Sequence, residues 1–343
     1  MTAIDDEFVS IVIPTRNRAD LIGGAIESVL TQSADRRTYE CVVVDNHSSD
    51  DTAAIVRRFE DRFPGVVHYV RERRIGVSWA RNAGIATSRG TIVGFVDDDV
   101  RVDREWLGNA RRLLQGDRRL QYVGGPVRPI WTTEPPNWLT RDHWSPLALV
   151  DHGDAPFDVP AERPICLLTA NLFVRRGALD RVGWFDPAFP RCQDRELMLR
   201  LWKAGLDGLY APEVAAQTVV PPERVTREYH RRWHWTHGQS VARMPLREAW
   251  GDGGWAVEPA QGGSFLGAPF SQYRALADRA VQWARSSLAG QHDDAFAHEL
   301  QARYSLAYIW SSMKLWRGGR WRLGQDRRDP AGSALISRFP SRR

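Results

Sequence analysis

The chain has 343 residues, of which 43% are hydrophobic and 26% charged, so it can bury a full core and is neither disordered nor fibrous. No apolar run reaches the roughly 18 residues of a membrane span, and the first residues lack the basic and apolar regions of a signal peptide. We therefore expect a cytoplasmic protein. The three cysteines have no metal-ligand or redox spacing, and their odd number argues against a disulfide framework.

The first 130 residues alternate strand and helix patterns, which predicts parallel βαβ units. Strands are expected at 8–14, 39–44, 66–70 and 91–96, with helices at 19–32, 51–59 and 77–87. The second half is less regular. We expect strands at 123–129 and 165–174, a loop rich in Pro, Trp and Asp at 131–164, helices at 195–204 and 226–244, a flexible Gly-rich stretch at 251–267, and amphipathic helices at 272–288 and 295–316.

The strand expected at 91–96 ends at three consecutive acids, Asp97, Asp98 and Asp99. Three carboxylates at the carboxyl end of a buried strand repel one another unless a divalent cation neutralises them. Ligands also bind at this edge in open α/β sheets. An isolated acidic triplet is as typical of a solvated loop or a helix cap as it is of a metal site, so the remaining motifs decide between these interpretations.

The acids belong to one of five blocks that follow in a fixed order: Val-Ser-Ile-Val-Ile-Pro-Thr-Arg-Asn-Arg at 9–18, Val-Val-Val-Asp-Asn-His-Ser-Ser-Asp at 42–50, Gly-Val-Ser-Trp-Ala-Arg-Asn-Ala-Gly at 76–84, Phe-Val-Asp-Asp-Asp at 95–99, and Thr-Ala-Asn-Leu-Phe-Val-Arg-Arg at 169–176. Gly-Trp-Phe-Asp at 183–186 and Gln-Asp-Arg-Glu at 193–196 follow. In order and spacing, residues 8–240 resemble a family 2 nucleotide-sugar glycosyltransferase with the GT-A fold.

The resemblance implies an α/β, Rossmann-like mixed sheet flanked by helices, with a C-terminal helical extension. We expect a catalytic domain at 1–245, divided into a nucleotide-binding half at 1–130 and an acceptor-binding half at 131–245. Residues 246–343 would form the extension with its basic tail. The implied activity is the inverting, metal-dependent transfer of a single sugar from a nucleoside diphosphate to an acceptor hydroxyl.

The motifs also imply the donor site. Asp99 and Asp97 would coordinate Mn²⁺ or Mg²⁺, which prefer oxygen ligands and substrate phosphates. We favour a UDP-sugar as donor, although neither the base nor the sugar follows from the sequence. The donor-binding residues are expected to be Pro14, Thr15, Arg16, Asp45, Arg81, Asn82, Asp97 and Asp98. For most of them a structural role is the alternative, such as helix capping by Asp45.

Two positions depart from the family pattern. The family places a Glu-Asp pair before a helix, and here Gln193 and Asp194 occupy it. We assign the general base to Asp194, and loss of the neighbouring acid should lower its pKa relative to a paired site. The histidine that often ligates the metal is replaced by Thr218. Either water completes the metal shell, or a histidine from the next helix does: His230, His234 or His237.

Aromatic rings suggest how an acceptor binds, because tryptophan faces stack on sugar rings. Trp131 and Trp138 fall in the irregular segment and Trp184 in a turn, where core packing is a less automatic explanation. We predict that they bind a carbohydrate-bearing or lipid-linked acceptor together with His234, which faces the same groove.

The cell-surface setting is inferred from charge. From Lys314 onward the chain carries many arginines and only two acids, Asp326 and Asp329. Such a tail prefers anionic surfaces, and we expect contact with the inner face of the cell membrane during assembly of a bacterial surface glycan or lipid-linked oligosaccharide. No nucleic-acid-binding module is recognisable. A homodimer, an enzyme that decorates a small natural product or peptide, and a nucleotide-sugar-binding protein without turnover stay open.

Overall fold

The computed structural model describes residues 7–159, 165–244, 248–251, 254–259 and 263–318. It confirms the α/β prediction and divides into two compact units. The first unit is Met1–Glu134 with Leu147–Pro221, and the second is Pro135–Pro146 with Pro222–Arg343. The division therefore falls before helix α7 (Arg227–Val241), which we had expected in the catalytic domain and which packs on helix α9 (His292–Arg317) in the second unit.

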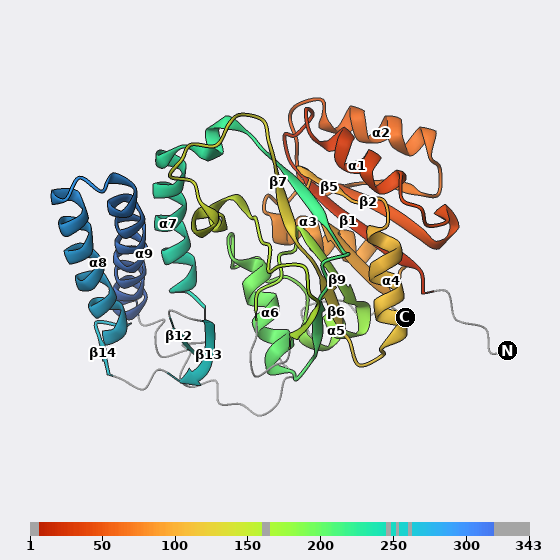
Figure 1. The fold of residues 1–343 in the computed structure, drawn as a ribbon. Coiled ribbons are helices and arrows are strands. Elements are labelled where there is room, and N and C mark those ends of the chain that lie inside the picture. Colours follow the sequence, from red (N-terminus) through yellow and green to blue (C-terminus); the bar gives the residue numbers. More distant parts are fainter. Residues whose placement is uncertain (1–6, 160–164, 245–247, 252–253, 260–262, 319–343) are drawn as a thin grey trace. The chain divides into compact units, whose positions relative to one another are not determined.

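The first unit is built on an eight-stranded mixed sheet with the order β3-β2-β1-β4-β9-β6-β10-β8 (Figure 1). The first four strands in this order are parallel, whereas β9 is antiparallel to both neighbours. The strands are β1 (Val9–Thr15), β2 (Tyr39–Asp45), β3 (Val67–Arg71), β4 (Ile92–Val96), β6 (Tyr122–Gly124), β8 (Phe157–Val159), β9 (Asn171–Arg175) and β10 (Gly208–Tyr210).

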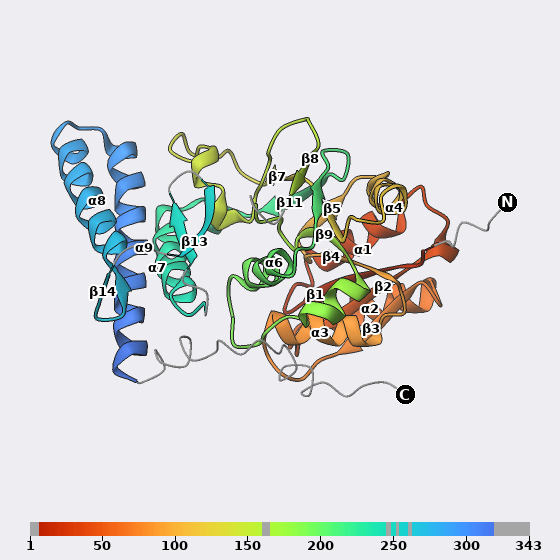
Figure 2. The same cartoon turned by 90° about the horizontal axis from the view of Figure 1, so that it is seen from below.

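Helices cover both faces of this sheet, so its central strands are continuous apolar runs. Helices α1 and α4 lie on one side and α3 and α5 on the other (Figure 2). Helix α3 approaches β1 closely because of Gly84, where a Cβ atom would lie 2.3 Å from Val12 Cγ1. The helices are α1 (Ile22–Leu30), α2 (Thr52–Arg62), α3 (Val77–Thr87), α4 (Trp106–Gly116), α5 (Arg176–Val182) and α6 (Gln193–Lys203). The predicted helices at 19–32, 51–59, 77–87 and 195–204 are confirmed.

The strand predicted at 123–129 is wrong as a single element. It is divided between β6 in the large sheet and β7 (Val127–Trp131) in a three-stranded sheet with β5 (Val100–Val102) and β11 (Ala216–Val220). Pro126, which has no N–H to donate to a ladder, lies at the break. The buried Asn171 side chain fixes this junction, since its nitrogen donates to the carbonyls of Pro126 (3.0 Å) and Val214 (2.7 Å).

In the second unit, α9 lies between α7 and α8 (Phe270–Leu288) (Figure 2). The two predicted C-terminal helices are thereby confirmed. The described part of the Gly-rich stretch and the residues beside it form two short strand pairs: β12 (Glu248–Gly251) with β13 (Gly254–Pro259), and β14 (Ser264–Phe265) with β15 (Ala268–Pro269). Among the described helices, none combines the length and the apolar composition of a membrane span. The arginine-rich tail beyond residue 318 lies outside the described residues.

Candidate active site

The predicted donor residues come from strand ends that the sheet brings together. Thr15 and Asp45 are register partners at the carboxyl ends of β1 and β2, and β4 runs parallel beside β1. The strand order turns back between β1 and β4, since β2 and β3 lie on one side of β1 and β4 on the other. Such a switch point is where open α/β sheets bind ligands. Asp97 follows β4 at this position.

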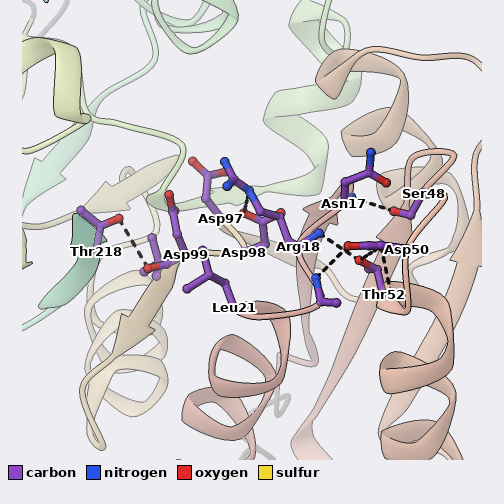
Figure 3. Close-up of polar contacts among 12 residues, drawn as sticks. Asn17, Arg18, Leu21, Ser48, Asp50, Thr52, Asp97, Asp98, Asp99 and Thr218 are labelled. Atoms are coloured by element: carbon purple, nitrogen blue, oxygen red, sulfur yellow. Dashed lines mark hydrogen bonds and ion pairs between the residues drawn. The ribbon is translucent and has the colours of Figure 1, made fainter. Parts of the chain in front are cut away.

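The loops that follow β1 and β2 are tied together (Figure 3). The Asn17 N–H donates to Ser48 Oγ (3.0 Å), and the Arg18 N–H donates to Thr52 Oγ1 (2.9 Å). The Arg18 backbone is therefore fixed, while its guanidinium extends toward Asp98, with 3.8 Å between Arg18 Nε and Asp98 Oδ1. We did not single out Arg18 from the sequence. The sequence did give a reason to select Arg18, because it is a cation just after a strand that ends at the switch point.

The acidic triplet is strained electrostatically. Burial and the charges of Asp99 and Asp97 raise the pKa of Asp98 to about 7, although Arg18 and the Thr15 hydroxyl oppose this rise. Asp99 is buried, and its backbone carbonyl accepts from the Val219 N–H (2.8 Å). This contact between strands also places the Thr218 hydroxyl 3.5 Å from the same carbonyl (Figure 3).

Arg81 links the acids to the neighbouring helix. Its side chain is buried, its Nη2 lies 2.8 Å from Asp97 Oδ1, and its guanidinium lies over the Phe185 ring at 5.3 Å. Its Nε makes no hydrogen bond among the described residues, so a buried donor is left for a ligand. Asn82, in contrast, is engaged at both ends: its nitrogen donates to the Phe185 carbonyl (2.8 Å) and its oxygen accepts from the Phe185 N–H (3.0 Å).

Asp194 lies in the first turn of α6, and the charges of Arg81 and Asp97 reach it. Burial raises the pKa of Asp194, opposed by the Arg195 N–H, which donates to Oδ1 at 2.8 Å, and by the positive charges of Arg81 and Arg195. The expected effect of Gln193, a lower pKa than at a site with two acids, stays a prediction, and the net shift from the ordinary aspartate pKa is upward because of burial. A raised pKa suits a group that must accept a proton.

The remaining donor predictions differ in their surroundings. Asp45 is buried and satisfied, because Oδ1 accepts from the Ser48 N–H (2.8 Å) and Oδ2 from the Tyr69 hydroxyl (2.8 Å). Pro14 is buried within β1, whereas Arg16 is exposed beyond the strand.

The four predicted acceptor residues are divided between the two units. Trp131 ends β7 and Trp184 donates from Nε1 to Asp180 Oδ1 (3.0 Å), both in the first unit. Trp138 belongs to the second unit and is 9% exposed, so little of its ring is left for an acceptor. His234 is 8% exposed, with Nδ1 2.9 Å from the His230 carbonyl. We assign Trp138 and His234 to the core of the second unit.

The second-unit core is an aromatic cluster with histidines inside it. The Trp138 ring meets the rings of His230 (4.9 Å) and Phe296 (5.0 Å) edge to face. His237 stacks instead on Trp233 at 4.2 Å. Burial lowers the pKa of His230 to about 3 and that of His234 to about 4. Among the described residues, no group of three or more His, Cys, Asp or Glu side chains is placed to hold a metal ion.

These histidines predict acid sensitivity. Both are neutral in the folded chain and protonate near pH 6.5 when unfolded, so the unfolded state binds more protons below that pH. Stability should be full above pH 6.5 and fall toward pH 4 by about 1.4 kcal/mol per pH unit for each histidine. Urea unfolding at several pH values measures this slope. The slope should become smaller in His230→Phe, and an unchanged slope would contradict the assignment.

The acids suit a divalent cation that takes only part of its ligands from the protein. Carboxylate oxygens are hard ligands, and burial together with the charges of Asp99 and Asp97 raises the pKa of Asp98, so a cation bound here would relieve the repulsion within the triplet. Because no cluster of three such ligands is described, diphosphate oxygens and water would complete the shell, as is usual for Mg²⁺. The Thr218 hydroxyl is the polar group that β11 brings beside Asp99.

Comparison with known proteins agrees with this architecture. The family model "Glycosyl transferase family 2" matches residues 10–171, and "Glycosyl transferase family group 2" matches residues 92–322, more than half of the chain. Glycosyltransferase AglE of Haloferax volcanii is 30% identical over 207 residues, which cover 60% of this chain and 65% of AglE. The match thus spans less than two thirds of the length of AglE.

Two further similarities extend the comparison. Succinoglycan biosynthesis protein ExoM of Rhizobium meliloti is 26% identical over 228 residues, covering 63% of this chain and 70% of ExoM. The mannosyltransferase PcManGT from Pyrobaculum calidifontis, solved in complex with GDP-Man and Mn²⁺, has a TM-score of 0.57 at 22% identity. Its match covers 94% of this chain and 88% of PcManGT, which supports the GT-A fold. The chain therefore belongs to glycosyltransferase family 2.

Proposed function

We propose that the protein is an inverting glycosyltransferase that moves one sugar from a nucleoside-diphosphate sugar to an acceptor hydroxyl. The observation that carries this proposal is the gathering of Asp97, Arg81 and Asp194 at the sheet's switch point. Asp194 is the carboxyl group that can take a proton. Asp97 belongs to the acid cluster that can bind a cation, and Arg81 can bind phosphate.

Asp194 is proposed to act as the general base. The acceptor oxygen would form a bond to the anomeric carbon as the bond to the diphosphate breaks, and Asp194 would take the hydroxyl proton. A single displacement inverts the anomeric configuration. The raised pKa of Asp194 strengthens it as a base relative to an exposed aspartate, because burial disfavours its charged form.

The second requirement is that the negative charge on the departing diphosphate be stabilised. Asp99 and Asp97 would hold Mn²⁺ or Mg²⁺, which when bound supplies Lewis-acid stabilisation of the leaving group. Arg81 already pairs with Asp97, and its unpartnered Nε is a buried donor for a phosphate oxygen. Arg18 lies beside Asp98 and can offer a second cation.

We infer that the acceptor is part of a surface glycan. This inference is supported by ExoM, whose name assigns it to succinoglycan biosynthesis. Complexes such as that of PcManGT with GDP-Man and Mn²⁺ support a nucleotide-sugar donor and a divalent cation. Trp131 and Trp184 remain the acceptor-stacking candidates in the first unit, and a lipid-linked acceptor at the membrane face is the proposed setting.

Nucleotide binding tests the proposal. Calorimetric or thermal-shift titration with UDP, GDP, dTDP and CDP, each with and without Mn²⁺ or Mg²⁺, should show one nucleotide that binds only with metal present. We favour UDP. If no nucleotide binds with metal, the first-unit site is not a donor site. If one binds but no sugar is transferred to any glycan acceptor, a binding protein becomes the better interpretation.

A further inference from the structure

Exposed hydrophobic side chains are concentrated near the end of the described chain. Of the nine large hydrophobic side chains exposed among the described residues, eight lie between residues 265 and 316. They are carried by β14 and by helices α8 and α9 of the second unit: Phe265, Phe270, Val281, Trp283, Leu288, Leu306, Trp310 and Trp316. This concentration cannot be the ordinary scatter of surface hydrophobics, and it indicates an interaction surface.

Helix α8 turns its apolar side away from the protein. An outward face is formed by residues that recur three, four or seven positions apart and are all exposed: Phe270, Ala277, Val281, Ala284 and Leu288. Leu288 is 90% exposed. The one buried residue of the helix is Ser286, and the buried Gln272 Oε1 accepts no hydrogen bond among the described residues. Ala275 and Leu276, on the other side of α8, are half-buried, so the helix has apolar residues on both sides and packing on α9 does not account for the outward stripe.

Positive charge flanks this outward face. Helix α8 carries three arginines and one acid, and Arg274 and Arg285 are both exposed next to the apolar stripe. The acids of α9 are largely neutralised, because Asp293 pairs with Arg227 and Glu299 with Arg231. Asp278 offsets one of the three arginines, so α8 has a net charge of +2, and the surface combines exposed apolar side chains with an excess of positive charge.

We propose that the outward face of α8 docks on an anionic lipid surface. Helices that lie in a membrane interface have an apolar side, flanking Lys or Arg, and aromatic residues, and this is the composition found here. On α9, Lys314 lies 3.4 Å from the centre of the Trp310 ring, a pairing of cation and aromatic ring that also suits an interface. Nineteen helical residues give a contact about 28 Å long. Charge complementarity favours lipid over a second copy, because two such faces would bring like charges together.

Binding of the full chain to lipid vesicles tests the proposed docking face. The assay contains neither donor nor acceptor, so the result does not depend on the transfer activity. Co-sedimentation with vesicles of phosphatidylcholine and phosphatidylglycerol should exceed that with phosphatidylcholine alone, and salt should weaken it. The double variant V281E/L288E should bind about tenfold or more weakly. The matched control S271E/Q282E adds the same charge on exposed polar positions of the same helix and should bind much closer to the unsubstituted chain.

Three outcomes would overturn the proposal. The unsubstituted chain could fail to bind anionic vesicles. The two double variants could bind equally, which would assign the attraction to the arginine-rich tail instead of α8. Analytical ultracentrifugation could show a dimer that V281E/L288E alone dissociates, in which case a second copy covers the face. Unchanged circular dichroism and unchanged nucleotide binding would show that both variants fold.

Discussion

Asp194→Asn is expected to slow sugar transfer by about a hundred- to ten-thousandfold, the usual contribution of a general base. Nucleotide binding should remain, because the substitution keeps the shape of the side chain while removing its charge and its ability to accept a proton. Asp194 lies within reach of the charges of Arg81 and Asp97, so a small change in donor affinity is compatible with the assignment. Steady-state transfer rates and nucleotide titration on the same preparation separate the two effects.

The pH profile adds a second readout. Transfer needs the deprotonated carboxylate, so the rate should fall as pH drops through the raised pKa of Asp194, at a higher pH than for an ordinary aspartate. Asp207→Asn is the matched control, since it removes the charge of an exposed aspartate just beyond the same helix. Near-normal transfer by Asp194→Asn would show that another group takes the proton.

Elements with a strong local pattern could be predicted from the sequence. Helix α3 was expected at 77–87 and spans Val77–Thr87, and strands β1 to β4 appear where apolar runs end in polar residues. Helix α4 was missed, although Trp106, Leu107, Ala110 and Leu114 have helical spacing and are its buried residues. That signal was present. The break between β6 and β7 had a local signal in Pro126, but the contacts that hold it come from Asn171 on a distant strand and could not be predicted from the sequence.

The candidate site shows the same limit at the level of side chains. Motif position selected Asp97, Arg81 and Asp194 as candidates, and the fold pairs Arg81 with Asp97 and brings both charges within reach of Asp194. Motif position could not show that both polar ends of Asn82 are used by the Phe185 backbone, because partners of a polar side chain come from residues distant in sequence. Trp138 was taken for a ligand-stacking ring from the composition of its loop. It is buried instead, because that loop packs into the second unit.

Asp99→Asn is expected to remove the metal-dependent part of nucleotide binding, weakening it by about a hundredfold or more. Loss of an outer-shell partner alone typically costs ten- to a hundredfold in metal affinity, and loss of a direct ligand should cost at least as much. The turn should persist, because the Asp99 backbone carbonyl, and not its carboxylate, accepts from Val219. Thermal-shift titration with nucleotide and with or without Mn²⁺ measures the loss.

Stability without metal distinguishes lost ligation from misfolding. Asp99 raises the pKa of Asp98 through like-charge repulsion, so removing its charge should leave the metal-free melting temperature unchanged or higher. Asp103→Asn, which neutralises an exposed acid in the same segment, should keep the metal-dependent shift. If Asp99→Asn also keeps that shift, the metal is bound elsewhere, and the role of the acidic triplet would be to orient Arg18 and Arg81 toward the diphosphate.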